Sequence, residues 1–405
     1  AGISYILGSH DFHYQNLIAH KEYPVLVDLE NMFQTDEEIF NIGECTYLKY
    51  SVLSNNLFPA NMSTRMFCAV TGGNGGSGNY QVPMINVSDK KIGIVYGRPK
   101  MEIGFNLPKQ EIDTRKYLKQ IWKGYSCAYR YFKNISDAEI QSIFSEEITS
   151  RHLVHDTQLY YNILQASYHP SLMMKYGERE AFLKKICPKG MTREYEIEDM
   201  NAGDIPYFYR KTDSRSLFTS AGQEIAGYFK ETVSEAVIRR KHMLNQAERK
   251  LQCELIRLSV ELSEMNGKML ENGSYFYNEV GEKKKEWFEL AIIMAEKIKE
   301  RAIWNESKTR VTWLTLKCSA KREENVAIDR IDYYLYEGLA GIVVFFKAMN
   351  LACGMYDKIC SAAEETLFEY TESILDGRRK TISNYTGAYC GEGAIVYAYQ
   401  ILLSV

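Results

Sequence analysis

A dense group of polar side chains lies near the start of the chain, in the stretch GSHDFHYQNLIAHKEYPVLVDLE. Asp11 precedes Asn16 by five residues, and His13 lies between them. The stretch ends with the carboxylates of Asp28 and Glu30. Carboxylate and amide oxygens are ligands that Mg²⁺ prefers, and a carboxylate can also orient an attacking hydroxyl. These residue types at these intervals indicate phosphoryl transfer from a nucleotide bound through magnesium.

The interval between Asp11 and Asn16 matches a known catalytic loop. Protein kinases carry the pattern H-R-D-L-x-x-x-N, in which the Asp meets the substrate hydroxyl and the Asn holds a metal ion. We therefore expect Asp11 to lie beside the hydroxyl, His13 to contact that hydroxyl or a phosphate oxygen, and Asn16 to bind Mg²⁺. The alternative is a solvated polar loop beside an edge strand.

The apolar run YPVLVDLE is expected to form a short buried strand that positions Asp28 and Glu30. Side chains two residues apart on a straight strand share one face, so both carboxylates could point at one metal ion. A kinase also needs a Gly-rich loop and a strand Lys before the catalytic loop, and we expect both upstream of Ala1. GGNGGSG at residues 72–78 fits G-x-G-x-x-G, but no helical pattern follows it, so we predict a flexible loop.

A second polar group lies in the largely helical middle of the chain, in TSRHLVHDTQLYYNIL. Arg151 and Thr157 are six residues apart, so one helix would not place them side by side. A turn between them, with Thr157 as the N-cap of the following helix, would bring both to one end. A helix N-terminus beside an Arg can bind an anion. From the pattern alone, an ordinary helix cap with a surface Arg is the simpler alternative.

Two segments near the end of the chain resemble each other. YEGLAGIVVFF begins at Tyr336 and YCGEGAIVYAY begins at Tyr389, 53 residues later. Each predicts a Gly-rich turn that leads into an apolar helix. Helical units repeated in this way are typical of αα-hairpins that stack in an array or close into a ring. None of the cysteines in this region has a metal-binding pattern, so we expect no zinc ligand in this chain.

Composition narrows the possible partners and compartments. The net charge of −3 provides no general basic surface for nucleic acid. No apolar run approaches the roughly 20 residues that a membrane helix needs. The nine cysteines are odd in number and include no C-x-x-C pair, which favours free thiols in a reducing compartment. We predict a cytoplasmic protein without a nucleic-acid partner and without stable membrane insertion.

Taken in order, these motifs resemble the class II lanthipeptide synthetases (LanM) over nearly the whole chain. The matching segments are DFHYQNLIAHKEYPVLVDLE, RHLVHDTQLYYNILQASYHP, GDIPYF, and the pair LYEGLAGIVVFF and YCGEGAIVYA. Enzymes of this family phosphorylate Ser and Thr of a precursor peptide with ATP and Mg²⁺. They then eliminate the phosphate to leave dehydroalanine or dehydrobutyrine. A cyclase domain with Zn²⁺ adds peptide Cys thiols to these alkenes and forms lanthionine rings.

The resemblance implies a fold and a division into domains. The expected fold is an α+β, lipid-kinase-like dehydratase core with added helices, followed by the first repeats of an all-α α/α toroid. Residues 1–268 would form the dehydratase domain without its N-terminal nucleotide lobe. Residues 269–405 would form the first part of the LanC-like cyclase. The implied partner is a precursor peptide with a leader and a core rich in Ser, Thr and Cys.

The resemblance also assigns roles to individual residues. Asp11 and His13 match the catalytic positions of phosphoryl transfer. Asn16, Asp28 and Glu30 match its Mg²⁺ and nucleotide ligands. The pair used for elimination is matched by Arg151, which would bind the leaving phosphate, and by Thr157, which would assist its departure or the removal of the α-proton.

The sequence departs from the family pattern in several places. His155 stands where the family commonly has a second Arg, so a phosphate contact there would be weaker or pH-dependent. We expect the zinc ligands beyond Val405, and the isolated chain is expected neither to bind ATP well nor to cyclise peptides. Two alternatives are a small-molecule or lipid kinase with a helical tail, and a non-catalytic scaffold that binds peptides. The scaffold alternative predicts that Asp11 and Asp28 do not converge in space.

Overall fold

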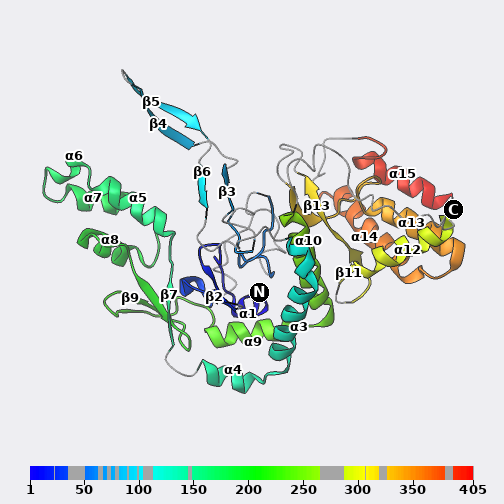
Figure 1. Cartoon of the computed structure of the whole chain (residues 1–405), viewed down its shortest axis with the longest axis horizontal. Coiled ribbons are helices and arrows are strands. Elements are labelled where there is room, and N and C mark those ends of the chain that lie inside the picture. The colour runs from blue at the N-terminus through cyan, green and yellow to red at the C-terminus, as the bar shows by residue number, and fades with distance from the viewer. Residues whose placement is uncertain are drawn as a thin grey trace. The chain divides into compact units, whose positions relative to one another are not determined.

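The computed structural model divides the chain into two compact units. It describes residues 1–21, 23–34, 51–62, 67–70, 74–77, 82–88, 91–97, 100–103, 113–144, 148–264, 287–305, 307–318, 326–378 and 386–404. Unit 1 comprises Ala1–Leu57, Phe67–Leu107 and Lys123–Leu244, and unit 2 comprises Phe58–Met66, Pro108–Trp122 and Asn245–Val405. Helix α3 (Leu118–Asn134) contributes residues to both units. Figure 1 shows a mixture of helices and small sheets, in agreement with the mixed α and β composition expected from the sequence.

The first part of unit 1 carries short antiparallel strand pairs. Its elements are α1 (Gly2–Leu7), β1 (Leu17–His20), β2 (Tyr23–Leu26), the 3-10 turn η1 (Leu29–Asn31), β3 (Asn74–Ser77), β4 (Val82–Ser88), β5 (Lys91–Gly97) and β6 (Lys100–Ile103). β1 pairs with β2, β3 with β6, and β4 with β5. Because β3 lies within GGNGGSG, the expectation of a flexible loop is wrong for residues 74–77, whereas residues 72, 73 and 78 lie outside the described residues.

The strand that precedes Asp28 differs from the expected buried strand. β2 ends at Leu26, and Tyr23 and Val25 are 63% and 41% exposed. A two-stranded pair covers neither of its faces by itself, so an apolar, β-branched sequence alone does not make the strand buried. The expectation of a buried strand at this position is wrong.

The second part of unit 1 joins a four-stranded sheet to a group of helices. The elements are α4 (Asp137–Ile143), β7 (Thr149–His152), α5 (Thr157–Ser167), α6 (Pro170–Met173), α7 (Glu178–Ile186), α8 (Arg193–Ala202), β8 (Phe208–Lys211), β9 (Leu217–Thr219), β10 (Glu224–Ile225) and α9 (Val233–Met243). The strand order is β10-β9-β8-β7, with antiparallel neighbours. Tyr160, Leu183 and Met200 belong to a core shared by α5, α7 and α8. The sheet thus holds Arg151 of β7 just before α5 begins.

Unit 2 contains the predicted repeat. Its remaining elements are η2 (Thr114–Tyr117), α10 (Gln246–Ser263), α12 (Trp287–Glu300), β11 (Ile303–Trp304), β12 (Val311–Thr312), β13 (Leu314–Cys318), β14 (Val326–Arg330), α13 (Leu339–Cys353), α14 (Asp357–Leu375) and α15 (Glu392–Leu403). Gly338 and Gly391 are the N-caps of α13 and α15, which confirms the Gly-rich turn before each apolar helix. The backbone N–H of Tyr336 donates to the carbonyl of Tyr389, 3.1 Å away, so the equivalent residues of the two repeats are bonded together.

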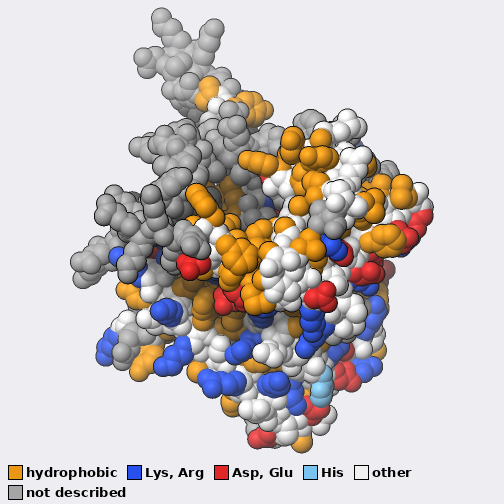
Figure 2. All heavy atoms as spheres, turned by 90° about the vertical axis from the view of Figure 1, so that its right-hand side faces the viewer, with side chains coloured by type: hydrophobic (Ala, Val, Ile, Leu, Met, Phe, Trp, Pro, Cys, Tyr) orange, Lys and Arg blue, Asp and Glu red, His pale blue; other side chains and the backbone are white. Residues whose placement is uncertain are grey.

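The repeat glycines allow a close approach of backbone segments. A Cβ on Gly338 would lie 2.3 Å from the carbonyl oxygen of Asp332, closer than a side chain can come. Large apolar side chains remain on the surface of unit 2, among them Leu375, Val396 and Leu403. Figure 2 shows hydrophobic side chains gathered on the surface. Within the described part of the chain, none of the helices combines the length and the hydropathy needed to cross a membrane.

Candidate functional site

Backbone hydrogen bonds fix the loop that contains Asp11. The N–H of Phe12 donates to the carbonyl of Asn55 at 2.9 Å, and the Phe12 side chain is only 1% exposed. Asp11 itself has a φ of +64°, a backbone conformation that costs free energy in a residue other than glycine. The loop therefore holds Asp11 in a strained conformation between well-anchored neighbours.

Asn16 ties this loop together from within. It is 6% exposed, and its Nδ2 donates to the backbone carbonyl of Asp11 at 2.9 Å. Its N–H donates to the carbonyl of His13, and its carbonyl accepts from Val27 on the far side of the β1–β2 hairpin. These bonds use the side-chain nitrogen, so the Oδ1 atom of Asn16 remains for a cation. The five-residue interval between Asp11 and Asn16 thus corresponds to a direct contact.

Other charged residues of the predicted site change the pKa of the Asp11 carboxyl group. The surrounding protein desolvates this carboxyl and raises its pKa above the usual range; His13 acts in the opposite direction. The carboxylate of Asp28 raises the pKa of Asp11 further, a hydrogen bond with Asn56 lowers it, and Asp156 raises it slightly. Asp11 and Asp28 are therefore within electrostatic reach of each other.

The residues predicted to bind Mg²⁺ do not form a cluster of three metal-ligating carboxylates or imidazoles within the described part of the chain. Magnesium, however, is usually bound by one or two carboxylates together with phosphate oxygens and water. Asn16 and Asp28 have side chains of the types that such a site uses. The carboxylates of Asp11 and Asp28 repel each other, and a cation would relieve this repulsion. Ligation of Mg²⁺ by Asn16, Asp28 and Glu30 stays a prediction.

Asp28 and Glu30 do not share the face of a straight strand. Asp28 has a φ of +56° and caps η1, and Glu30 lies inside this turn. The turn separates the two carboxylates and directs Glu30 to a new partner. Oε2 of Glu30 accepts a hydrogen bond from Nη1 of Arg151 at 2.6 Å, in an ion pair between residues 121 positions apart. This ion pair joins the two polar groups that the sequence analysis singled out.

Arg151 keeps hydrogen-bonding capacity beyond this ion pair. Its Nε atom is buried and has no hydrogen-bond partner among the described residues. Its guanidinium lies 5.6 Å from the ring centroid of Tyr207, the residue just before β8, which is the strand paired with β7. Guanidinium groups bind oxyanions well, and binding of the leaving phosphate by Arg151 stays a prediction.

Thr157 begins helix α5 but does not cap it. The N-cap is Asp156, whose side chain accepts from the N–H of Gln158 at 2.8 Å. The expectation of Thr157 as N-cap is therefore wrong, because the neighbouring Asp is an equally good or better cap. Thr157 occupies the first helical position instead, half-buried, at the helix end that carries partial positive charge.

A buried carboxylate lies next to this helix end, and the sequence analysis missed it. Glu196 of α8 is 1% exposed, and its Oε2 lies 3.8 Å from Nε2 of His155. Thr192 and Cys187 donate to Glu196 at 2.5 and 3.4 Å, and burial, followed by the charge of Glu196, raises the pKa of the Cys187 thiol to about 12. The position that carries Arg in the family is thus filled here by a His held beside a carboxylate. The two residues are 41 positions apart, so local sequence patterns do not reveal this pairing.

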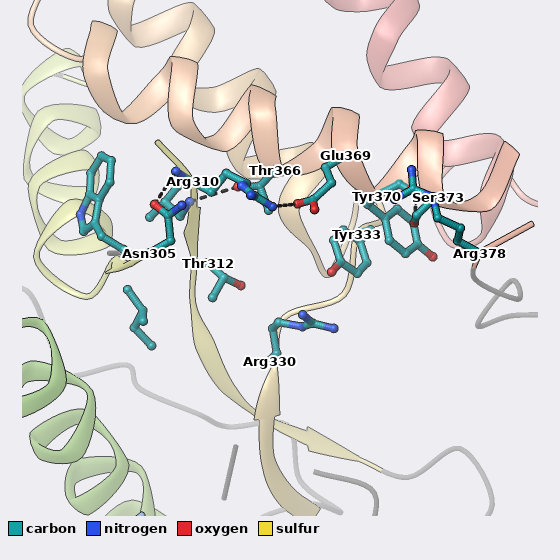
Figure 3. A pocket seen from close by; sticks show the side chains of 13 residues that line it. Asn305, Arg310, Thr312, Arg330, Tyr333, Thr366, Glu369, Tyr370, Ser373 and Arg378 are labelled. Carbon is teal, nitrogen blue, oxygen red and sulfur yellow. Dashed lines mark hydrogen bonds and ion pairs between the residues drawn. The ribbon is translucent and has the colours of Figure 1, made fainter. Parts of the chain in front are cut away.

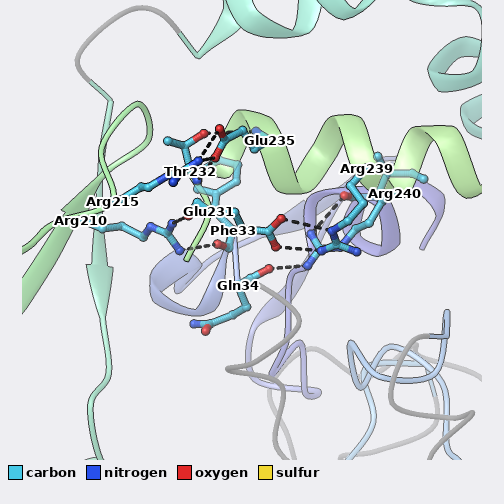
Figure 4. Close-up of polar contacts among 10 residues, drawn as sticks. Phe33, Gln34, Arg210, Arg215, Glu231, Thr232, Glu235, Arg239 and Arg240 are labelled. Atoms are coloured by element: carbon cyan, nitrogen blue, oxygen red, sulfur yellow. Dashed lines mark hydrogen bonds and ion pairs between the residues drawn. The ribbon is translucent and has the colours of Figure 1, made fainter. Parts of the chain in front are cut away.

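Two buried arginines hold the segment that follows Glu30 (Figure 4). Arg240 of α9 donates to the carbonyl of Gln34 at 2.5 Å, and Arg210 of β8 donates to the carbonyl of Phe33 at 3.1 Å. The two arginines are 9% and 1% exposed. Arg240 is therefore buried, although it belongs to the charged run RRK at residues 239–241. These contacts fix η1 against the sheet and α9, and thereby position Glu30.

Comparisons with known proteins agree with the order of motifs. Residues 1–211, just over half of the 405 residues, match a family model described as "Domain of unknown function (DUF4135)". Over 369 aligned residues, covering 84% of this chain, the sequence is 24% identical to a protein of Lactococcus lactis subsp. lactis named lacticin 481/lactococcin biosynthesis protein LcnDR2. The chain spans 38% of the length of that relative. The predicted resemblance to lanthipeptide synthetases is confirmed, and the chain belongs to the DUF4135 family.

Proposed function

We propose that the chain is part of a bifunctional lanthipeptide synthetase that dehydrates Ser and Thr of a precursor peptide. The observation that supports the proposal is the Arg151–Glu30 ion pair, in which a residue proposed for elimination contacts a residue proposed for phosphoryl transfer. The printed name of the Lactococcus relative, a lacticin 481/lactococcin biosynthesis protein, agrees with this class of product. The domain boundary at residue 268, the kinase-like core and the toroid belong to the same proposal.

In the first step, the hydroxyl oxygen of a peptide Ser or Thr forms a bond to the terminal phosphorus of ATP, while the bond from that phosphorus to the bridging oxygen breaks and ADP leaves. Asp11 accepts or orients the hydroxyl proton, and His13 meets the hydroxyl or a phosphate oxygen. Mg²⁺ bound to ATP supplies charge neutralisation, and Asn16 and Asp28 would hold it. Phosphoryl transfer depends mainly on positioning and charge, so the strained, well-anchored Asp11 loop supports this role.

In the second step, the phosphate leaves the same residue. A base removes the α-proton, the electrons of the Cα–H bond form the Cα=Cβ double bond, and the Cβ–O bond breaks with its electrons going to the phosphate. Arg151 holds the departing phosphate through the edge not used by Glu30. Thr157 assists the departure or the proton removal from the positive end of α5. Stabilising the leaving charge while the proton is removed lowers the barrier of the elimination.

The repeat in unit 2 supports a cyclase domain in the intact enzyme. Gly-capped α13 and α15 are equivalent helices, and exposed apolar side chains such as Leu375 and Leu403 fit a surface that further repeats would cover. Addition of Cys thiols to the dehydrated residues, with Zn²⁺, is proposed for the intact enzyme. A kinase for small molecules or lipids would need neither the repeat nor the ion pair between Arg151 and Glu30.

The test uses the intact enzyme with ATP, Mg²⁺ and its precursor peptide, with the products followed by mass spectrometry. The wild-type enzyme should remove one water per modified residue. Arg151→Ala and Thr157→Ala should each accumulate phosphopeptide, whereas Arg215→Ala, at an exposed ion pair with Glu235, should behave like wild type. Unphosphorylated peptide from either site variant would contradict the elimination roles, and an unchanged peptide with wild-type enzyme would contradict the proposed function.

A further inference from the structure

A second candidate binding site lies within unit 2. A cavity of about 540 Å³ opens between the β11–β12 hairpin, the end of β14 and helix α14. Its size is within the range of pockets that take small molecules or a few residues of a peptide. Figure 3 shows Arg310 beside Asn305, Arg330 between Thr312 and Tyr333, and Arg378 beside Ser373.

The charge of this pocket is positive. Three arginines line it, Arg310, Arg330 and Arg378, and Glu369 is the carboxylate among its lining residues. Arg310 pairs with Glu369, and Arg378 pairs with Asp376 at 2.7 Å. Arg330 has no carboxylate partner among the described residues. Within the part of the chain that the structure describes, the positive charge of Arg330 is therefore not neutralised by a carboxylate and attracts an anion.

Other side chains of the pocket occupy both faces of the Tyr333 ring. Tyr333 and Tyr370 stack with ring centroids 3.5 Å apart and an interplanar angle of 5°. The guanidinium of Arg330 lies over the Tyr333 ring, 5.4 Å from its centroid, and must be on the face that Tyr370 leaves open. A nucleobase therefore has no free face of Tyr333 on which to stack. The Arg330 guanidinium is instead positioned by the ring, with its hydrogen-bonding edge left for a ligand.

The spacing of the arginines points to an extended ligand. The three side chains come from different segments and lie along the pocket rather than around one point (Figure 3). A single phosphate would favour convergent guanidinium groups, whereas several carboxylates on one chain match separated ones. Thr312 adds a hydroxyl at the pocket wall that can bond to a peptide group.

We propose that this pocket binds an acidic segment of a peptide, with Arg330 paired to one of its carboxylates. The identification of that peptide with the precursor rests on the proposed function, but the binding itself does not. If both hold, the pocket retains one part of the substrate while another part reacts in unit 1. Binding can be measured with the 405-residue chain alone, without ATP or turnover.

The experiment measures fluorescence anisotropy of a labelled ten-residue peptide with four spaced Glu residues, at low salt. Matched peptides carry Gln, or a single phosphoserine among Gln residues, in the same positions. The Glu peptide should bind most tightly, lose affinity as salt rises, and change the emission of Trp304, which lines the pocket. Arg330→Gln should weaken binding roughly tenfold, the value expected for one charge-assisted contact.

Two further variants make the test specific. Lys297→Gln removes one positive charge from the exposed surface of α12, outside the pocket, and should leave the affinity unchanged. Glu369→Gln removes the pocket carboxylate and should tighten binding of the Glu peptide. Equal binding of the Glu and Gln peptides, an unchanged affinity in Arg330→Gln, or preference for the phosphoserine peptide would each overturn the proposal. Failure here leaves the dehydration test unaffected, because that test uses different residues and a different readout.

Discussion

The candidate site of unit 1 and the pocket of unit 2 both contain arginines, but in opposite electrostatic settings. In unit 1, Arg151 is matched by Glu30, and Asp11 sits in a strained loop with like charges nearby. In unit 2, Arg330 has no carboxylate partner among the described residues and rests on a stacked Tyr pair. Balanced, interacting charges suit a site where charge moves during a reaction. An arginine without a carboxylate partner among the described residues suits a site that holds an anionic ligand.

The largest expected effect separates the two regions directly. Asp11→Asn keeps the size of the side chain but removes the base, so phosphorylation by the intact enzyme should fall about 10³-fold. Binding of the Glu peptide should not change, because Asp11 is not part of the unit 2 pocket. Phosphorylation rates at saturating peptide and peptide anisotropy provide the two readouts. A loss of both, or of neither, would remove the distinction drawn between the regions.

Acid should destabilise unit 1 through His152. Burial, assisted by the charge of Arg210, lowers the pKa of His152 from 6.5 to about 3. Below pH 6.5, His152 binds a proton in the unfolded chain but stays neutral in the folded chain. The free energy of unfolding therefore falls as the pH drops from 6.5 toward 3, by up to about 1.4 kcal/mol per pH unit. His152→Phe should reduce this slope in urea unfolding measured at several pH values. His20→Gln, on the exposed hairpin, is the control, and an unchanged slope in His152→Phe would contradict the assignment.

Arg240 should matter for stability more than its sequence neighbour. Arg240→Met leaves the carbonyls of Gln34 and Ile6 without this donor and should cost about 2 kcal/mol of unfolding free energy. Arg239→Met removes a partly exposed pair with Glu231 and should cost less than about 1 kcal/mol. Chemical denaturation measures both. Equal losses would show that the hydrogen bonds of the buried Arg240 do not set the position of the η1 segment.

The smallest expected effect concerns the pH profile of phosphorylation. Asp156 contributes to the raised pKa of Asp11, so Asp156→Asn should lower that pKa and move the acid limb of the rate profile to lower pH. Asn caps a helix as well as Asp, so α5 should remain intact. Rates measured between pH 5 and 8 would show the shift, with Asp213→Asn as the control. A shift to higher pH would contradict the assigned charge relation.

Local patterns predicted the contacts that are close in sequence. The Gly turns before α13 and α15 appear as expected, because these features depend on a few adjacent residues. The cap at Asp156 was mistaken for Thr157 because both residue types cap helices and only the backbone decides between them. These are errors of one position and leave the site in place.

Contacts between residues that are far apart in the sequence could not be predicted from local patterns. Arg239 and Arg240 have the same chemistry, yet only the second is buried, because the carbonyl of Gln34, 206 residues away, accepts its hydrogen bond. The burial of Glu196 beside His155 likewise depends on the packing of α5 against α7 and α8. The strand before Asp28 was expected to be buried because its residues are apolar, but burial requires a covering layer that no local pattern encodes.

We propose that the Arg151–Glu30 pair joins the residues for phosphorylation to those for elimination, and a double-mutant cycle tests this most directly. The intact enzyme and its Arg151→Gln, Glu30→Gln and double variants would receive a phosphorylated precursor peptide, and the rate of phosphate elimination would be measured. We predict that each single variant eliminates phosphate much more slowly and that the double variant is hardly slower than either. Elimination at the wild-type rate in both single variants, or effects that multiply in the double variant, would contradict the claim.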